Sequence, residues 1–541
     1  MPGDQGRPIG PIAGDRQANA SAIALPELAF FVVALAVVVA ISALHLFHPI
    51  NIVSYDRDVW HHIAVLNALL DSPFHAGNPH IVSDVPSRSY MPWYVALAVL
   101  GRWLGLTAQQ LLGISATLSM LALVVGIRLF SRAYFGQRWA PLVLLLVTFG
   151  SWAGAFNHTG FHTFSTMAFS ASYPFAIVFG AGYIAWWLVL EALRSKAPRQ
   201  VLGAILGAIA LITAFMFATH QLQAAFAIGG MLTFALFHGS FPYARRGLIV
   251  LAVLAGVLLS SRWWYYNPLD YAAIGGFYSL PFTPPFDWTN PLVVVAILGH
   301  ALVGVVGFYD LRRKAWRLDL ALGTAGIIGG LIVLYLAGSW MVLRLLPFLV
   351  VFLQISTTAL LFDLPDRSQG RFRGALRPIL VGVIVGMFVA NAAMATGFSL
   401  LAYRYLDGQA DAKFETWSRD INATASAVRA IVGDGRVVIA NWTTAYPMQA
   451  HHMKVVSIPY HFPEVPDSPV RQEASRAFFA PETGAAQRCS ILRQYNVTAI
   501  VYRGAMVPAQ VQLELNAFGE KIDVNDVTVV RLPAPGACAQ P

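Results

Sequence analysis

Long apolar stretches recur along the chain and alternate with short polar segments. A helix that crosses a lipid bilayer needs about 20 mostly apolar residues, and the first stretch, at about residues 26–47, has that length. Further stretches follow at about 91–105, 108–130, 140–156, 173–193, 201–218, 222–238, 248–262, 290–309, 318–338, 340–362 and 376–400. This pattern predicts a polytopic α-helical membrane protein.

Clusters of Arg and Lys predict which connections face the cytoplasm, because such clusters stay on that side. They are Arg128/Arg132/Arg138, Arg194/Lys196/Arg199, Arg245/Arg246, Arg312/Arg313/Lys314/Arg317 and Arg367/Arg371/Arg373. All of them fall on one side if the stretch 91–105 is a surface or re-entrant helix. That arrangement has about eleven spans, with residues 1–25 as a cytoplasmic tail. A crossing at 91–105 would give about twelve spans and misplace the first cluster.

The composition supports the membrane class and argues against another. The chain has 541 residues, of which 57% are hydrophobic and 12% charged, whereas an average soluble domain has about 25% charged residues. The net charge is +9, a sign that basic nucleic-acid-binding proteins share. Because the basic residues lie in short clusters between apolar stretches, as topology signals do, we expect no nucleic-acid partner.

After residue 402 the composition becomes that of a soluble domain, and we predict a small periplasmic α/β domain at 403–541. Helices are expected at 415–432 and near 485–495, and strands at 437–440, 455–458, 497–502 and 527–532. The only two cysteines, Cys489 and Cys538, lie in this domain. An oxidising periplasm would join them in a disulfide.

A polar loop at residues 48–107 follows the first span of the membrane domain, which we place at 26–402. Two carboxylates, Asp56 and Asp58, lie near its start. One interpretation is a helix N-terminal cap, since a helix with an apolar face is expected directly afterwards. The other is a general base that deprotonates an acceptor hydroxyl, with the second carboxylate as its partner. Both can hold, because a helix start is a rigid mount for a carboxylate.

Four histidines on the outer side are candidate substrate ligands. His61 and His62 follow Asp58 on the same expected helix, and His62 shares its face because it comes four residues later. Packing at the membrane interface is one interpretation. The other is a divalent-cation site for Mg or Mn, in which Asp58 and His62 are joined by His158 or His162. The sequence leaves the metal unknown.

Three further residues are candidate substrate ligands. Arg344 lies about one turn inside the outer end of a late span, where a charge is costly. It either reaches lipid headgroups or binds a phosphate, with which guanidinium pairs bidentately. His220, at a tight turn between two helices, is placed to assist it, and Arg88 lies in the first outer loop.

With these features in view, the chain resembles the GT-C superfamily of integral membrane glycosyltransferases over nearly its whole length. The resemblance rests on the outer C-terminal domain, on Asp56 and Asp58 followed by Trp60-His61-His62, on Tyr90-Met91-Pro92 and on Arg344-Leu345-Leu346-Pro347. It implies that a first-loop carboxylate is the base, with Asp58 matching best and Asp56 second. It also implies a polyprenyl-phosphate sugar as the donor.

Together these expectations describe a glycosyltransferase of the bacterial inner membrane. It would move a sugar to a hydroxyl of an envelope glycan or lipid on the periplasmic face, with inversion, while membrane lipids surround it. The C-terminal domain is expected to be accessory, because His451, His452 and His461 have no acid partner at helical spacing. The rival interpretation is a transporter or flippase, which predicts ionisable residues at the membrane midplane and internal repeats. The charges here fall at span ends, and the hydropathy pattern does not repeat.

Overall fold

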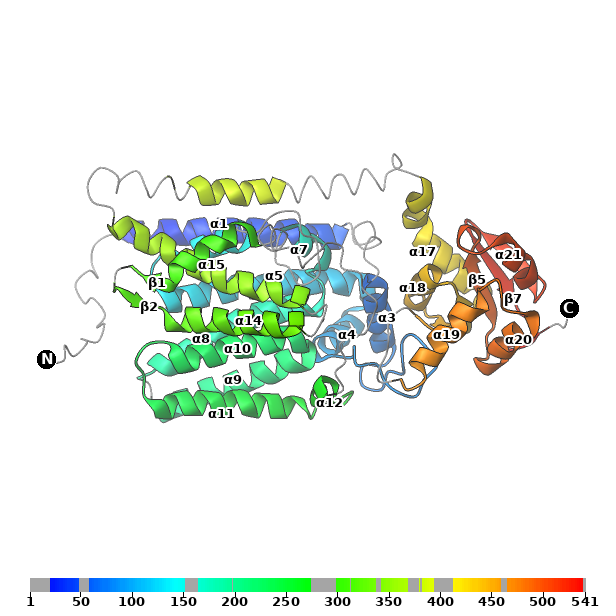
Figure 1. Ribbon diagram of the computed structural model, residues 1–541, viewed down its shortest axis with the longest axis horizontal. Coiled ribbons are helices and arrows are strands. Elements are labelled where there is room, and N and C mark those ends of the chain that lie inside the picture. The colour runs from blue at the N-terminus through cyan, green and yellow to red at the C-terminus, as the bar shows by residue number, and fades with distance from the viewer. Residues whose placement is uncertain are drawn as a thin grey trace, which may run out of the picture.

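The computed structural model describes residues 20–47, 58–150, 164–196, 198–273, 298–311, 313–336, 342–367, 379, 382–393, 412–458 and 465–538. It consists of a long bundle of helices and a smaller domain of strands and helices attached to one end of the bundle (Figure 1). The other end of the bundle carries a short hairpin, so the two ends differ in structure.

The bundle is built from apolar helices, most of them long, that run along its axis (Figure 1). They are α1 (Ala20–Phe47), α5 (Ala108–Phe135), α6 (Ala140–Gly150), α8 (Pro174–Arg194), α9 (Arg199–Thr219), α10 (Gln221–Phe237), α11 (Tyr243–Ser260), α14 (Leu318–Leu336) and α15 (Val342–Arg367). Within the described residues, seven helices are long and apolar enough to cross a membrane. The polytopic membrane fold is confirmed, and the number of about eleven spans stays a prediction.

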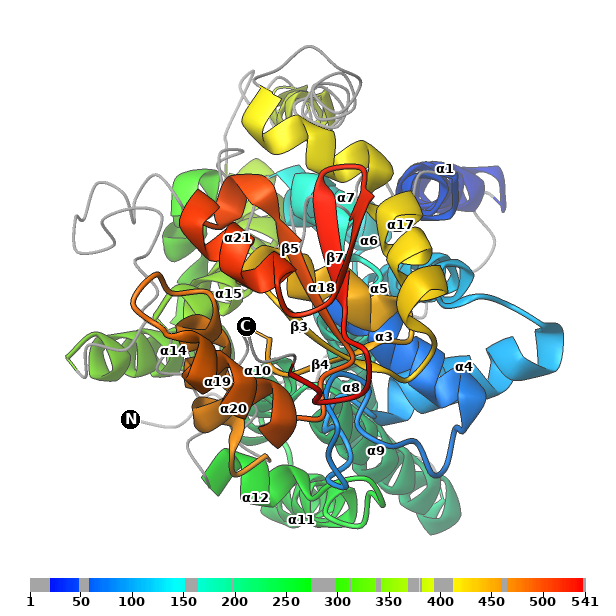
Figure 2. The ribbon, with the colours of Figure 1, turned by 90° about the vertical axis from the view of Figure 1, so that its right-hand side faces the viewer.

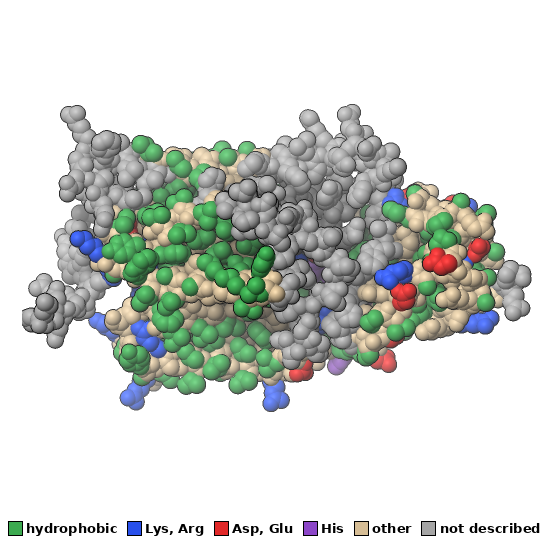
Figure 3. Space-filling view, viewed as in Figure 1, with side chains coloured by type: hydrophobic (Ala, Val, Ile, Leu, Met, Phe, Trp, Pro, Cys, Tyr) green, Lys and Arg blue, Asp and Glu red, His purple; other side chains and the backbone are tan. Residues whose placement is uncertain are grey.

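Helices α5 and α8 pack closely in the bundle because glycines face each other. A Cβ on Gly126 would lie 2.7 Å from the carbonyl oxygen of Gly180, and small residues at such contacts are typical of membrane interiors. Trp186 of α8 is fully buried among aromatic rings, and its indole N–H donates to the Ala227 carbonyl at 2.8 Å. On the face of the bundle that Figure 3 shows, hydrophobic side chains are frequent, whereas most charged ones lie near the edges and on the C-terminal domain.

Short helices lie toward the end of the bundle that faces the C-terminal domain (Figure 1). They are α3 (Asp58–Asp71), α4 (Pro92–Leu104), α7 (Phe164–Ser170) and α12 (Pro268–Ala273). With 13 residues, α4 is about 20 Å long and too short for a hydrocarbon core of about 30 Å. This length agrees with the expectation that the stretch 91–105 does not cross.

The opposite end carries the 3₁₀ helix η1 (Gly299–Phe308) and a hairpin of β1 (Tyr309–Asp310) and β2 (Ala315–Trp316). Arg317, just after the hairpin, donates to the Asp363 carboxylate of α15 at 2.6 Å. Both side chains are largely shielded from solvent. A largely buried ion pair therefore holds the hairpin to the bundle.

The C-terminal domain contains a five-stranded sheet in the order β4-β3-β5-β7-β6. Its strands are β3 (Val437–Ala440), β4 (Lys454–Val455), β5 (Ala499–Arg503), β6 (Glu520–Val524) and β7 (Val527–Arg531). Its helices are α17 (Ala412–Val432), α18 (Trp442–Ala450), α19 (Ser468–Phe478), α20 (Ala485–Gln494), η3 (Gly504–Met506) and α21 (Ala509–Asn516). β3 runs parallel to β4 and β5, whereas β7 is antiparallel to β5 and β6. The predicted α/β fold is confirmed, and Figure 2 shows the domain in front of the bundle.

Cys489 and Cys538 form the predicted disulfide, with their Cα atoms 5.6 Å apart. The bond ties the end of the described chain to α20. Next to it, Arg488 is fully buried and pairs with Glu514 of α21, while its Nε donates to the Phe478 carbonyl at 2.9 Å. A disulfide therefore ties the chain end to α20, and a buried arginine joins α20 to α19 and α21.

The first polar loop and the C-terminal domain interlock. Helix α18 packs against α3, and the Asn67 side-chain amide donates to the Ala450 carbonyl at 2.8 Å. Farther along the loop, Ile81 is buried in the core of the C-terminal domain. The backbone N–H of Val455, in the edge strand β4, donates to the His80 carbonyl at 2.8 Å. The loop thus covers an edge of the sheet that would otherwise be exposed.

Candidate active site

Asp58 is the first residue of α3, at the end of the bundle next to the C-terminal domain (Figure 1). The helix begins there because Asp favours the first turn of a helix, and because Val59, Ile63 and Leu66 follow on a buried face. The structure is thus compatible with a capping role and with a base at the same position. Asp56 lies outside the described residues.

Four imidazoles, His61, His62, His80 and His220, gather near Asp58, and we call them the histidine cluster. The ring of His61 stacks on that of His80 with centroids 4.4 Å apart, and the rings of His61 and His62 lie 5.5 Å apart. His220, at the junction of α9 and α10, is close enough to His62 to lower the pKa of that ring, although burial has the larger effect.

Two tyrosines form a wall beside His62. The ring of Tyr94, in α4, lies 5.5 Å from the His62 ring, and that of Tyr173, just before α8, lies 4.4 Å away. Both tyrosines are buried. Burial raises the pKa of Tyr94 well above its usual range, and the neighbouring charge of Asp58 acts in the same direction. The Tyr94 hydroxyl therefore stays protonated near the carboxylate.

Two arginines contribute positive charge to the same region. Burial lowers the pKa of His61 to about 4, and the charge of Arg88 acts in the same direction. Burial also lowers the pKa of His220 to about 4, helped by the charge of Arg344. These two imidazoles are therefore neutral at pH 7. The structure therefore brings Arg88 close to His61, His220 close to His62, and Arg344 close to His220.

Several buried polar atoms in this region make no hydrogen bond of normal geometry within the described part of the chain. They are the Tyr94 hydroxyl, His62 Nδ1 and Thr219 Oγ1. A buried polar group without a partner costs about 1–3 kcal/mol, so folded proteins contain few of them. Water or a polar ligand satisfies such groups. The region therefore contains buried polar atoms that water or a polar ligand can satisfy.

Within the residues that the structure describes, no group of three or more His, Cys, Asp or Glu side chains, the histidine cluster included, has an arrangement that could hold a metal ion. His158 and His162, the further metal ligands considered from the sequence, lie outside the described residues. The expectation of Mg or Mn therefore stays a prediction, and no step of the chemistry below depends on it.

Aromatic residues after α11 hold the first loop against the bundle. The indole N–H of Trp263 donates to the Tyr90 carbonyl at 2.7 Å, and the Tyr265 hydroxyl donates to the Pro73 carbonyl at 2.9 Å. The rings of Tyr90 and Tyr265 lie 4.8 Å apart. The loop that carries the candidate residues is thus fixed from the bundle side.

Tyr94, Tyr173, His80 and Gln449 belong to the region but were not among the site candidates that the sequence suggested. A signal existed for Tyr94, because it lies in the same turn as Tyr90-Met91-Pro92 at the start of an apolar stretch. For Gln449 the sequence contains none, since its position depends on how the C-terminal domain docks onto α3.

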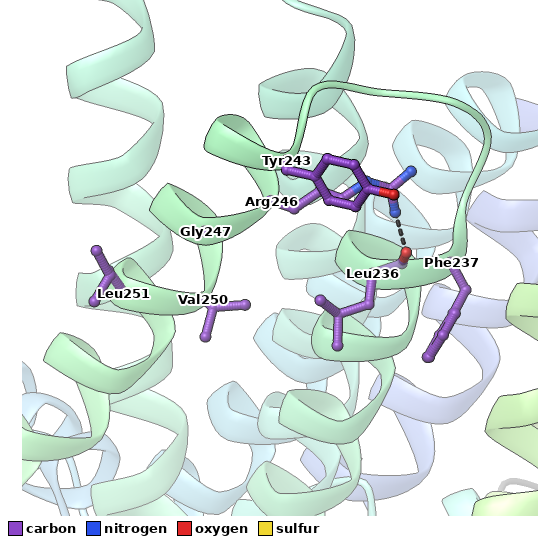
Figure 4. A pocket seen from close by; sticks show the side chains of 7 residues that line it. All are labelled: Leu236, Phe237, Tyr243, Arg246, Gly247, Val250 and Leu251. Atoms are coloured by element: carbon purple, nitrogen blue, oxygen red, sulfur yellow. Dashed lines mark hydrogen bonds between the residues drawn. The ribbon is translucent and has the colours of Figure 1, made fainter.

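A separate groove of about 510 Å³ lies at the opposite end of the bundle, between the end of α10 and the start of α11 (Figure 4). Apolar side chains line it, together with Tyr243 and Arg246. The Arg246 guanidinium donates to the carbonyls of Ala235 at 3.0 Å and Gly239 at 2.7 Å, which closes the end of α10. The guanidinium of Arg246 is thus held by backbone carbonyls, and most of the other lining residues are apolar.

The fold is that of solved GT-C membrane glycosyltransferases. ArnT from Cupriavidus metallidurans in the apo state matches with a TM-score of 0.56 at 13% identity, covering 96% of this chain and 100% of that chain. The Archaeoglobus fulgidus oligosaccharyltransferase in its apo form matches with a TM-score of 0.55 at 10% identity, covering 92% and 73%. The arabinofuranosyltransferase AftD from mycobacteria gives 0.52 at 15% identity, covering 89% and 40%.

Comparisons of the sequence itself found no matching family model and no matching curated protein. At identities this low, the structural likeness establishes the GT-C fold and does not transfer individual residue roles. The chemistry is therefore argued from the side chains at the start of α3.

Proposed function

We propose that the protein is an integral membrane glycosyltransferase that takes a sugar from a polyprenyl-phosphate donor. The observation that carries this proposal is the convergence of Asp58 with two arginines and the neutral histidine cluster at one end of the bundle. A lipid-linked donor would present its head group near one end of a bundle that spans the membrane. The shared fold with glycosyltransferases of this class supports the proposal.

In the proposed reaction, the oxygen of an acceptor hydroxyl attacks the anomeric carbon of the donor sugar. Asp58, with Asp56 as the second candidate, takes the hydroxyl proton. The bond from the anomeric carbon to the phosphate oxygen breaks, and its electron pair leaves with the polyprenyl phosphate. Arg344 and His220 hold that phosphate, since guanidinium forms charge-assisted hydrogen bonds with it. Attack from the face opposite the leaving group inverts the anomeric centre.

The donor class has support from one of the matching structures. ArnT from Cupriavidus metallidurans has been solved with undecaprenyl phosphate bound, and that structure matches with a TM-score of 0.55. The Archaeoglobus fulgidus oligosaccharyltransferase has been solved with a tethered acceptor peptide. For this chain we propose a hydroxyl of an envelope glycan or lipid, whose proton a positioned carboxylate can accept in the transition state.

The test is to incubate the purified full chain, in lipid, with a panel of polyprenyl-phosphate sugars and hydroxyl acceptors. We expect release of the polyprenyl phosphate together with a glycosylated acceptor. The rival function, a flippase, would move a fluorescent lipid-linked sugar across proteoliposomes without cleaving it. If the protein transports the lipid-linked sugar and cleaves no donor, the proposed function is wrong and the flippase function takes its place.

We further propose that Asp58 and the C-terminal domain face the periplasm of a bacterial inner membrane. The support is that the basic side chains Arg245 and Arg317 lie at the opposite end of the bundle. A membrane-impermeant maleimide should label Leu513→Cys in intact cells, and Tyr243→Cys only after permeabilisation. Both positions are well exposed, at 69% and 90%, so the reverse labelling pattern would invert the orientation.

A further inference from the structure

Residues 78–82 of the first loop, which we call the loop clasp, are built into the C-terminal domain. Ile81 is 2% exposed and belongs to the hydrophobic core of that domain. The backbone N–H of Val455 donates to the His80 carbonyl at 2.8 Å, and Lys454 Nζ donates to the Asn78 carbonyl. A segment of the membrane domain thus supplies a core residue and an edge contact to a domain that follows more than 300 residues later.

The loop clasp has a defined backbone. The side-chain oxygen of Asn78 accepts from the N–H groups of His80 at 3.0 Å and Ile81 at 3.2 Å. Its amide nitrogen donates to the Val85 carbonyl at 3.3 Å. Because one side chain bridges the turn in this way, a displacement of Ile81 would also displace His80.

The same turn reaches the candidate active site on its other side. The His80 ring stacks on the His61 ring at 4.4 Å, and His61 lies one turn after Asp58 on α3. Gln449 of α18 faces His80 from the domain side and is 1% exposed. A continuous set of contacts therefore runs from the domain core through Ile81, His80 and His61 to the start of α3.

We propose that Ile81 is a positioning residue and that the C-terminal domain is a working part of the active site. By anchoring the loop clasp, Ile81 holds His80 and His61, and through them the first turn of α3 with Asp58, in the arrangement that transfer needs. The proposal rests on the proposed function. It replaces the expectation of an accessory domain, which rested on histidines without an acid partner. His452 has such a partner across the interface, because its Nδ1 lies 3.7 Å from the Asp71 carboxylate.

The test compares Ile81→Ala with two matched variants of the full chain. Ile458→Ala removes the same side chain, equally buried at 2%, from the same core, but from the domain's own chain. Val82→Ala changes the next residue of the loop clasp, whose side chain is 55% exposed. The readouts are turnover with a donor from the panel, undecaprenyl-phosphate binding, and amide hydrogen exchange.

For Ile81→Ala we expect kcat to fall at least about tenfold, with undecaprenyl-phosphate binding within about threefold of wild type, because Arg344 on α15 is untouched. Amides of the loop clasp and of the first turn of α3 should exchange at least about tenfold faster. Ile458→Ala should lower the melting temperature of the domain, while kcat and amide exchange in the first turn of α3 stay near wild type. Val82→Ala should behave as wild type throughout.

Equal losses of kcat in Ile81→Ala and Ile458→Ala would overturn the proposal, because Ile81 would then serve only the stability of the domain. Unchanged exchange in the first turn of α3 of Ile81→Ala would overturn it as well. If the wild-type protein uses no donor of the panel, the proposed function fails. The exchange comparison still decides in that case whether Ile81 positions the start of α3.

Discussion

Both ends of the helical bundle contain a buried polar cluster, and the two clusters differ in how far the protein itself satisfies them. At the end away from the C-terminal domain, Asp319 is 4% exposed and lies 2.8 Å from His238 Nδ1. It also accepts from the Tyr134 hydroxyl at 3.1 Å. At the other end, the Tyr94 hydroxyl and His62 Nδ1 are buried without a hydrogen-bond partner in the described part of the chain.

Residue type alone does not separate the two clusters, since both contain aspartate, histidine and tyrosine. The state of their hydrogen bonds does. A carboxylate that is enclosed by its own neighbours stabilises the junction of its helices and has little capacity left for a ligand. Buried groups without partners are instead costly in the absence of a ligand or water. We therefore assign the cluster around Asp319 to structure and the one near Asp58 to function.

The largest effect is expected from Asp58→Asn. The transfer rate should fall by about 10²- to 10⁴-fold, because Asn keeps the size and capping ability of Asp but takes no proton from the acceptor. Release of polyprenyl phosphate by the purified protein measures the rate. Asp56→Asn is the matched variant. Loss of activity there with normal turnover in Asp58→Asn would move the base to Asp56, and activity in both would remove the first loop from the chemistry.

Arg344→Ala should weaken binding of undecaprenyl phosphate by about 10- to 100-fold, because hydrogen bonds to a charged group are worth about 1.5–3 kcal/mol. Arg344→Lys should recover part of the loss, since it restores the charge without the bidentate geometry. Arg245→Ala, at the opposite end, is the control and should bind normally. Equal weakening in Arg245→Ala would mean that the effect is a general one on the fold.

The sequence predicted elements well where an apolar run is bounded by turn residues. β3 matches its predicted bounds of 437–440, because Val437–Ala440 is a continuous apolar run that follows Gly435. β6 was missed, since Glu520, Lys521 and Asp523 make it look like a polar loop. Its ladder with β7 makes this segment a strand, and an edge strand tolerates such polar residues.

The candidate site could be predicted only in part. Asp58, Arg344 and His220 were proposed from the sequence because each lies at or beyond the outer end of an apolar stretch, a position that the hydropathy pattern defines. Ile81 and Gln449 were not found, since their roles depend on how the C-terminal domain docks onto the first loop. A single isoleucine in a polar loop has no periodicity that would show what it packs against.

A moderate effect on the stability of the fold is expected from pH. His61 and His220 have pKa values lowered to about 4 from 6.5, so between those values the unfolded chain binds more protons than the folded one. Stability should therefore be fully present above pH 6.5 and decline as the pH falls toward 4. Thermal unfolding across this range measures the decline, and His61→Gln should reduce its slope. A melting temperature that rises on acidification would show that these imidazoles are charged in the folded protein.

The smallest effect on transfer is expected from Asp319→Asn, although stability should fall. The Asp319 carboxylate also accepts from the Leu320 N–H at 2.9 Å. Both of its oxygens therefore have hydrogen-bond partners within the bundle. Breaking a buried network of this kind costs up to about 3–5 kcal/mol. Turnover per folded molecule should stay within about twofold of wild type, since no candidate ligand contacts this end.

Thermal unfolding and turnover measured on the same preparations of Asp319→Asn and Asp58→Asn give the comparison directly. Asp58→Asn should lose transfer with little change in melting temperature, because Asn still caps α3. Asp319→Asn should show the opposite pattern, because His238 and Tyr134 lose a charged acceptor. Loss of transfer in a stable Asp319→Asn protein would mean that a fully satisfied cluster also takes part in function, so that hydrogen-bond satisfaction does not separate the two ends.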